Sequence, residues 1–234
     1  MTIFRYALMK GLRSPLTLVV NCILPLIVIF VPPFWVAGDF LGADRYAGFG
    51  ILAMVIWSGA FLMAQGILND RENGTITRIL AGPISMFNYL VQNLLAFMVP
   101  LTVQLGLISI IGMILHGWDV TLALGLFVCY TVFTIASVAM SFAWNCLFKR
   151  RESSFTTFSA VLTFGIFLSG ALLPLSLFPD LVQYVGMIFP AYWAIRGIEV
   201  LLDTGVTVEY LISIAAMALF TIAFLLFGGK RRMI

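Results

Sequence analysis

Six long stretches of this sequence contain no Asp, Glu, Lys, Arg or His. An α-helix rises about 1.5 Å per residue and the hydrocarbon core of a bilayer is about 30 Å thick, so roughly 20 such residues can cross it. A charged side chain at the centre of a span costs about 2.5 to 3.5 kcal/mol on insertion scales. We therefore predict an all-α integral membrane fold with six transmembrane helices, at residues 16–37, 46–68, 87–115, 120–148, 153–175 and 210–229.

The composition supports the same class of protein. Hydrophobic residues make up 62% of the 234 residues and charged residues only 10%, against about 25% charged in ordinary soluble domains. The net charge of +3 is small and dispersed, so we do not expect nucleic acid as a partner. The three cysteines lie within apolar runs without metal-ligand spacing, and we expect neither disulfides nor a metal site.

Basic residues are divided unevenly between alternate connections. One side carries eleven basic and three acidic residues, and the other carries two basic and seven acidic residues. The two formal charges are therefore +8 and −5, which restore the net +3. Because cytoplasmic loops retain Lys and Arg, we expect a multi-pass protein of the prokaryotic plasma membrane with both termini in the cytoplasm.

Three further segments have a pattern of their own. Residues 1–15 alternate apolar and basic positions and suit a helix in the inner interface, although a disordered basic tail is the alternative. Residues 75–81 carry an apolar stripe at i, i+3 and i+4 spacing and predict a short helix outside the membrane, with a solvated loop as the alternative. Residues 176–209 have apolar pieces broken by Pro179 and Pro190, which predict a re-entrant helical hairpin on the outer side.

Few residues of this sequence are suited to catalysis, metal binding or ion coupling. His116 is the only histidine, so a histidine-based metal or catalytic site would rest on one residue. The six stretches lack the ionisable residues that carry coupling ions in many transporters. No Gly-x-x-x-x-Gly-Lys-Ser/Thr phosphate loop occurs, so we do not expect this chain to supply energy by binding a nucleotide itself.

Two motifs resemble one family along nearly the whole chain. The run from Asp70 to Ser85, DRENGTITRILAGPIS, is similar to the acidic, Gly-Thr and Leu-rich cytoplasmic signature of ABC-2 type permeases, the membrane subunits of ATP-binding-cassette exporters. Leu168-Ser169-Gly170 and Phe189-Pro190-Ala191-Tyr192 resemble the last external loop of that family, although the family often has Asn where Phe189 stands.

The resemblance implies a subunit that pairs with a second permease, as a homodimer or heterodimer, and with two cytoplasmic ATPase subunits. ATP and Mg²⁺ would bind to those partners, and no cofactor to this chain. Residues 75–81 would form the coupling helix that docks on the ATPase, and residues 1–15 an interfacial elbow. The implied ATPase contacts are Asp70, Glu72, Thr75, Ile76, Arg78, Ile79 and Leu80.

A structural role for Asp70 and Glu72 remains the alternative, because negative charge near a helix start is favourable by about 0.3 to 1 kcal/mol. Spans two and five would line the route or the dimer interface. The candidate residues there are Trp57, Gln65, Thr156, Ser159, Thr163 and Gly170.

We interpret the chain as the permease of an exporter for a drug, antibiotic or peptide. The alternatives are an energy-independent channel or carrier, a polysaccharide or lipid exporter permease, and a membrane enzyme.

The charge asymmetry leads to a topology prediction. Single cysteines at Asp39, Asp119 and Asp180 should react with an impermeant thiol reagent in intact cells, because the acidic side faces out. Cysteines at Asn73 and Glu152 should react only after the membrane is permeabilised. Labelling at Asn73 in intact cells would contradict this prediction and show that the protein has the opposite orientation.

Overall fold

The computed structural model describes residues 2–13, 19–31, 47–82, 84–172 and 178–230, and every regular element in these ranges is helical. The elements are α1 (Thr2–Arg13), η1 (Val19–Ile23), α3 (Leu24–Phe30), α4 (Ala47–Glu72), α5 (Thr75–Leu80), α6 (Met86–His116), α7 (Val120–Asn145), α8 (Arg151–Leu168), α9 (Asp180–Gly186), α10 (Pro190–Thr204) and α11 (Val208–Lys230).

Within these ranges, α4, α6, α7 and α11 are long and apolar enough to cross a membrane, and the pair α9 and α10 would add a fifth crossing if taken as one bent span. The predicted first span extends at both ends beyond the described residues. The predicted fifth span, residues 153–175, overlaps α8 over residues 153–168 only. The 18 residues of α8 start with Arg151 and Glu152 and carry several hydroxyl groups. An all-α membrane fold is therefore confirmed, while the count of six spans stays a prediction.

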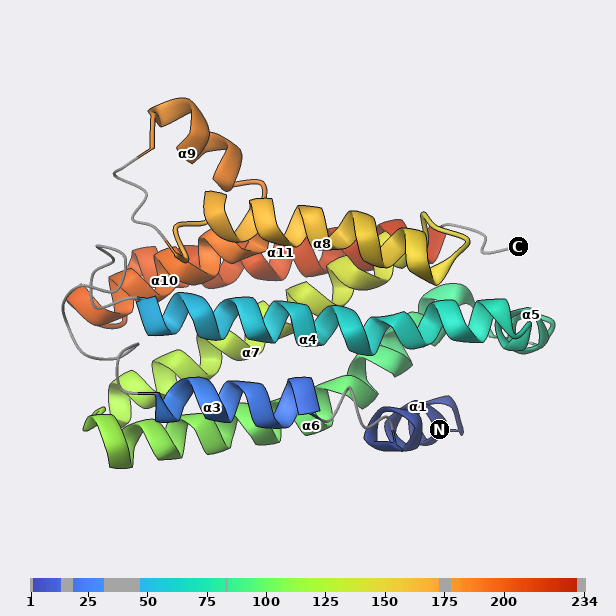
Figure 1. Cartoon of the computed structure of the whole chain (residues 1–234), viewed down its shortest axis with the longest axis horizontal. Coiled ribbons are helices and arrows are strands. Elements are labelled where there is room, and N and C mark those ends of the chain that lie inside the picture. The colour runs from blue at the N-terminus through green and yellow to red at the C-terminus, as the bar shows by residue number, and fades with distance from the viewer. Residues whose placement is uncertain (1, 14–18, 32–46, 83, 173–177, 231–234) are drawn as a thin grey trace.

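The long helices run along the length of the bundle, and the short helix α3 lies alongside α4 and α6 (Figure 1). Helices α1 and α5, the start of α8 and the end of α11 lie at one end. Helices α9 and α10 lie toward the other. This is the arrangement expected if the segments around α1 and α5 share one side of the membrane.

Local sequence explains where the long helices begin and end. The Ser85 hydroxyl accepts a hydrogen bond from the backbone N–H of Asn88 and caps α6, which stops at Gly117 with φ +67°. That left-handed conformation suits glycine. The Asp119 carboxylate then accepts from the backbone N–H of Leu122 and starts α7.

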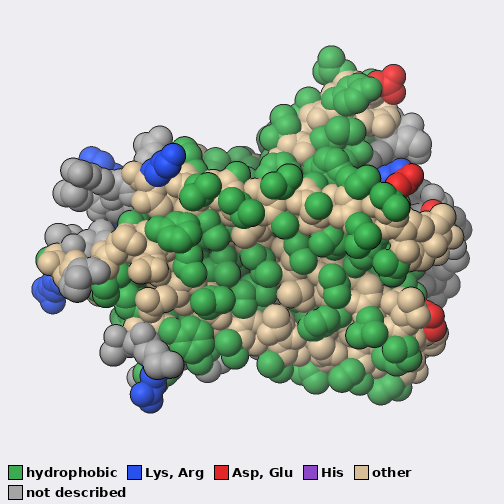
Figure 2. Space-filling model, turned by 180° about the vertical axis from the view of Figure 1, so that it is seen from behind, with side chains coloured by type: hydrophobic (Ala, Val, Ile, Leu, Met, Phe, Trp, Pro, Cys, Tyr) green, Lys and Arg blue, Asp and Glu red, His purple; other side chains and the backbone are tan. Residues whose placement is uncertain are grey.

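Charge is separated along the bundle axis. Figure 2 shows a broad hydrophobic surface between an end where Lys and Arg side chains gather and an end where most visible Asp and Glu side chains lie. The basic end is the one that carries α1 and α5. The three-dimensional arrangement thus follows the charge asymmetry of the sequence.

Helices α9 and α10, which correspond to the predicted outer hairpin, are bent by 104° relative to each other. Helix α10 packs into the bundle through Ala191, Ala194 and Ile198, all buried. Helix α9 stands away from it (Figure 1), and Leu181 is 75% and Ile188 65% exposed. The bundle thus buries the apolar face of α10 but leaves apolar side chains in α9 and in the turn after it exposed.

Trp57 of α4 is the centre of the larger hydrophobic cluster. Its fully buried ring makes edge-on contacts with Phe133 of α7 and Phe158 of α8, with ring centroids 6.4 and 6.2 Å away. Gly165 of α8 gives this ring its space, because a Cβ atom there would lie 2.7 Å from the indole and 3.1 Å from Phe189. Packing between α4 and α8 therefore depends on a glycine.

The change Gly165→Ala should lower the free energy of unfolding by about 1 to 3 kcal/mol, because the buried indole has no room to retreat. Gly106→Ala in α6 is the matched control, since its Cβ would meet only Phe127 at 4.0 Å. The control should be neutral or slightly stabilising because alanine favours the helix. Thermal unfolding in detergent would measure both, and equal effects would contradict this packing.

Candidate functional site

Helix α5 lies beyond the end of α4 and connects to it through a tight turn. Gly74 has φ +67°, and its N–H donates to the carbonyl of Arg71, which closes the end of α4. Helix α5 packs chiefly against α4. Ile76 is 1% exposed and belongs to a second hydrophobic cluster, which also contains Ile67 and Tyr89. Ile79 is half-buried against this second cluster, whereas Arg78 is exposed. Ile76 and Ile79 of the predicted apolar stripe thus anchor α5 to its own chain.

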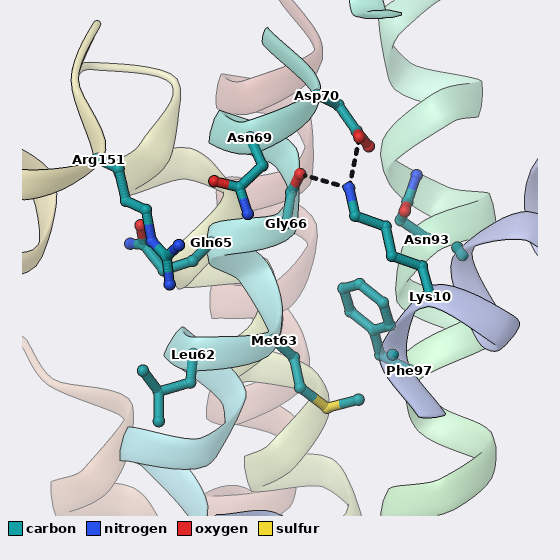
Figure 3. Close-up of a pocket in the computed structure, with 12 residues that line it drawn as sticks. Lys10, Leu62, Met63, Gln65, Gly66, Asn69, Asp70, Asn93, Phe97 and Arg151 are labelled. Carbon is teal, nitrogen blue, oxygen red and sulfur yellow. Dashed lines mark hydrogen bonds and ion pairs between the residues drawn. The ribbon is translucent and has the colours of Figure 1, made fainter. Parts of the chain in front are cut away.

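Asp70, in the last turn of α4, is 5% exposed and uses both carboxylate oxygens. Oδ1 pairs with the Lys10 ammonium of α1 (Figure 3). Oδ2 accepts from the Tyr89 hydroxyl of α6 at 2.9 Å. Lys10 also donates to the carbonyl of Gly66 at 3.0 Å. We call Lys10, Gly66, Asp70 and Tyr89 the Asp70 junction; it joins α1 and α6 to the end of α4.

The next two residues join α4 to the connection between α7 and α8. Arg71 donates through Nη1 to the carbonyl of Phe148 at 2.9 Å. Glu72 accepts through Oε1 from the backbone N–H of Arg151 at 3.1 Å. Since the capping residue Arg150 makes no side-chain cap hydrogen bond, Glu72 satisfies an N–H group at the start of α8 and adds to the negative charge of Glu152 in the first turn.

A buried polar cluster lies one and a half turns further into the bundle. Gln65 of α4 donates to Asn145 Oδ1 of α7 at 3.1 Å, and the Ser154 hydroxyl of α8 donates to the same oxygen at 2.7 Å. All three residues are at most 1% exposed. Gln65 also borders a cavity of about 130 Å³, together with Lys10, Asp70, Asn93 and Arg151 (Figure 3). The cluster connects three helices near the basic end.

Helix α8 has an uncovered face. Thr156, Ser159 and Thr163 are exposed on it, and each hydroxyl donates to the carbonyl four residues earlier. Phe164 is 66% exposed. The hydroxyl groups are therefore satisfied within the helix, which leaves a mildly polar surface able to face a second helix or a passing molecule.

The structure places the predicted site residues in different environments. Trp57 and Gln65 are buried inside the bundle, while the three hydroxyl residues of α8 face outward, so the two sets do not meet on one surface of this chain. Gly170 follows α8 with φ +80°. Thr75 is half-buried at the start of α5, and the side chain of Leu80 is outside the described part.

Of the four residues of the Asp70 junction, the sequence predicts only Asp70 as a site residue. Lys10 lies 60 positions before Asp70, and in the sequence it is one of several basic residues of the predicted interfacial helix. Gly66 and Tyr89 lie in predicted spans. A signal was present, since an acid at a basic membrane face suggests a paired cation, but several cations were available. In the described part of the chain, no group of three or more His, Cys, Asp or Glu could hold a metal ion.

These features define a multi-pass α-helical membrane protein with a short helix attached outside its bundle. The chain belongs to the ABC-2 family of transporter proteins, whose sequence model matches residues 17–230. The resemblance found in the sequence motifs is thereby confirmed.

A similar curated protein is the linearmycin resistance permease protein LnrN of Bacillus subtilis (strain 168). The two are 26% identical over 180 residues, which cover 76% of this chain and 46% of the relative. The chain thus spans less than half the length of that permease. Membership of the family makes this chain a membrane subunit of a transporter.

The polar cluster gives a stability prediction. Asn145→Leu should cost about 1 to 2 kcal/mol of unfolding free energy, because it leaves the Gln65 amide and the Ser154 hydroxyl without their acceptor in a buried site. Thr134→Val, on the same helix, is the control because that hydroxyl bonds only to its own helix at Tyr130. Unfolding in mixed micelles would compare them, and an unaffected Asn145→Leu would show that the cluster adds no stability.

Proposed function

We propose that this chain is the permease of an ATP-driven exporter that moves a hydrophobic or amphipathic compound out of the cytoplasm. Two cytoplasmic ATPase subunits would bind ATP and Mg²⁺, and this chain would bind no cofactor itself. A second permease copy, identical or related, would complete the transporter. Both termini would lie in the cytoplasm of a prokaryotic cell.

The position of α5 is the observation that carries this proposal. It is the helix attached outside the bundle at the basic end, where a cytoplasmic subunit has access. Its inner side is fixed by Ile76, and Arg78 is exposed on it. A partner that pushes on α5 therefore pushes on α4, against which α5 packs. The six predicted spans contain no Asp, Glu, Lys, Arg or His that could carry a coupling ion and drive transport from within the membrane.

The similar permease is named for resistance to linearmycin, which favours an antibiotic or a comparable amphipathic compound as the exported substrate. The uncovered face of α8 suits the second permease copy or the route between two copies, since it combines hydroxyl groups with exposed aromatic rings. An energy-independent channel or carrier, a lipid or polysaccharide exporter and a membrane enzyme are the alternatives. The channel or carrier and the enzyme would bind no ATPase.

Reversing the charge of Arg78 should weaken binding of the ATPase subunit. A loss of about 2 kcal/mol, as at a typical interface hot spot, corresponds to roughly 30-fold weaker retention. Because Arg78 is exposed, Arg78→Glu should leave the fold unchanged, which makes it a cleaner test than the half-buried Ile79→Asp.

Lys230→Glu, at the end of α11, is the matched control and should retain the partner. The measurement is co-purification of a subunit with a phosphate loop, together with thermal unfolding of the permease. If the Arg78→Glu variant retained the ATPase subunit as well as the Lys230→Glu variant does, α5 would not be the contact with that subunit. A chain that retains no such subunit under any condition would support the channel or carrier.

A further inference from the structure

The end of α4 joins more helices than any other short segment described above. Asp70 binds α1 and α6, Arg71 binds the connection after α7, and Glu72 binds the start of α8. All three lie within five residues of the start of α5. Any displacement of α5 therefore reaches these contacts before it reaches the rest of the bundle.

Asp70 differs from its two neighbours because it is buried and doubly bonded. Both of its oxygens are used, one by a cation and one by a hydroxyl group, and these partners come from different helices. Charge-assisted bonds of this kind are stronger than neutral ones, and burial protects them from screening. An acid that is oriented inward in this way and is only 5% exposed presents almost no surface to a cytoplasmic subunit.

We propose that Asp70 is a positioning residue that holds α1 and α6 to the end of α4, so that movement of α5 shifts these helices together. This inference rests on the proposed function for the source of the movement. It assigns Asp70 to the chain's internal mechanics in place of the ATPase contact expected from the family resemblance. Helix α1 thereby becomes a moving part, carried with α4 through Lys10.

The junction can be tested by distances between pairs of spin labels in the full chain in lipid nanodiscs. One pair, at Met9 and Asn73, reports on α1 against the end of α4; both sites are exposed. The second pair, at Asn73 and Asn88, reports on α4 against α6, and Asn88 is also exposed. In the native junction both distance distributions should be narrow.

Substitutions of the three side chains of the junction, Lys10, Tyr89 and Asp70, should change the two distance distributions in three different ways. Lys10→Met should broaden only the Met9–Asn73 distribution, by about twofold, because the Tyr89 contact remains. Tyr89→Phe should broaden only the Asn73–Asn88 distribution. Asp70→Leu should broaden both, and the charge-preserving Lys10→Arg should keep both narrow. A merely local packing role would not separate the two label pairs in this way.

Lys230→Met is the matched control, and its distributions should equal those of the native junction. The inference is overturned if Lys10→Met leaves the Met9–Asn73 distribution unchanged, or if Lys230→Met broadens it as much. These measurements need no ATPase, so they are independent of the proposed function.

The transmission step is tested in the complex with the ATPase, trapped with ATP and vanadate. With the native junction, the Asn73–Asn88 distance should stay constant on trapping while α4 moves. With Asp70→Leu it should change, because α6 no longer follows. A constant distance in both proteins would overturn transmission through Asp70, whereas failure of the ATPase to bind would overturn the proposed function and leave the first test standing.

Discussion

The exclusion of charge from hydrocarbon is the constraint on which the rest of this structure depends. Within a bilayer, backbone polar groups must be satisfied internally and isolated charges are costly, so long helices with neutral side chains are the available solution. The acids and bases are consequently concentrated at the two ends of the bundle (Figure 2). Contacts between helices that involve charged side chains are therefore found at these ends, and those of Asp70, Arg71 and Glu72 are all at the basic end. Inside the bundle the helices are joined by neutral groups, such as Gln65 and Asn145.

Much of the fold follows from this constraint and could be predicted from sequence. Helices α4, α6, α7 and α11 have bounds close to those of four charge-free stretches. These helices could be predicted because the length and the lack of charge of a segment can be read from that segment alone. The interfacial and outer short helices were indicated by periodicity and proline. The end of α4 was less predictable: the helix continues to Glu72, past the charge-free stretch, since its polar residues find partners on other helices.

The environment of individual site residues could not be predicted, for a physical reason. Asp70 and Arg78 are both charged residues of one short segment at the basic end, yet one is buried and the other exposed. The difference depends on Lys10 and Tyr89, which are distant in sequence and reach Asp70 only after α1, α4 and α6 pack together. Likewise, Gln65 is a neutral polar residue in a span, and its burial depends on Asn145 of another helix. Local patterns contain no information about such pairings.

The length of α4 shows why its end is an effective place to apply force. Its 26 residues extend about 39 Å, some 9 Å more than the hydrocarbon core, so one continuous helix reaches from the turn before α5 to the opposite end of the bundle. Near that far end Gly50 packs directly on the backbone of Ala171, so closely that a Cβ atom would lie 1.6 Å from its carbonyl oxygen. Trp57 lies between, packed against α7 and α8. Because close-packed interiors transmit displacement, a shift at Glu72 would be carried along α4 to the segment that precedes the outer hairpin.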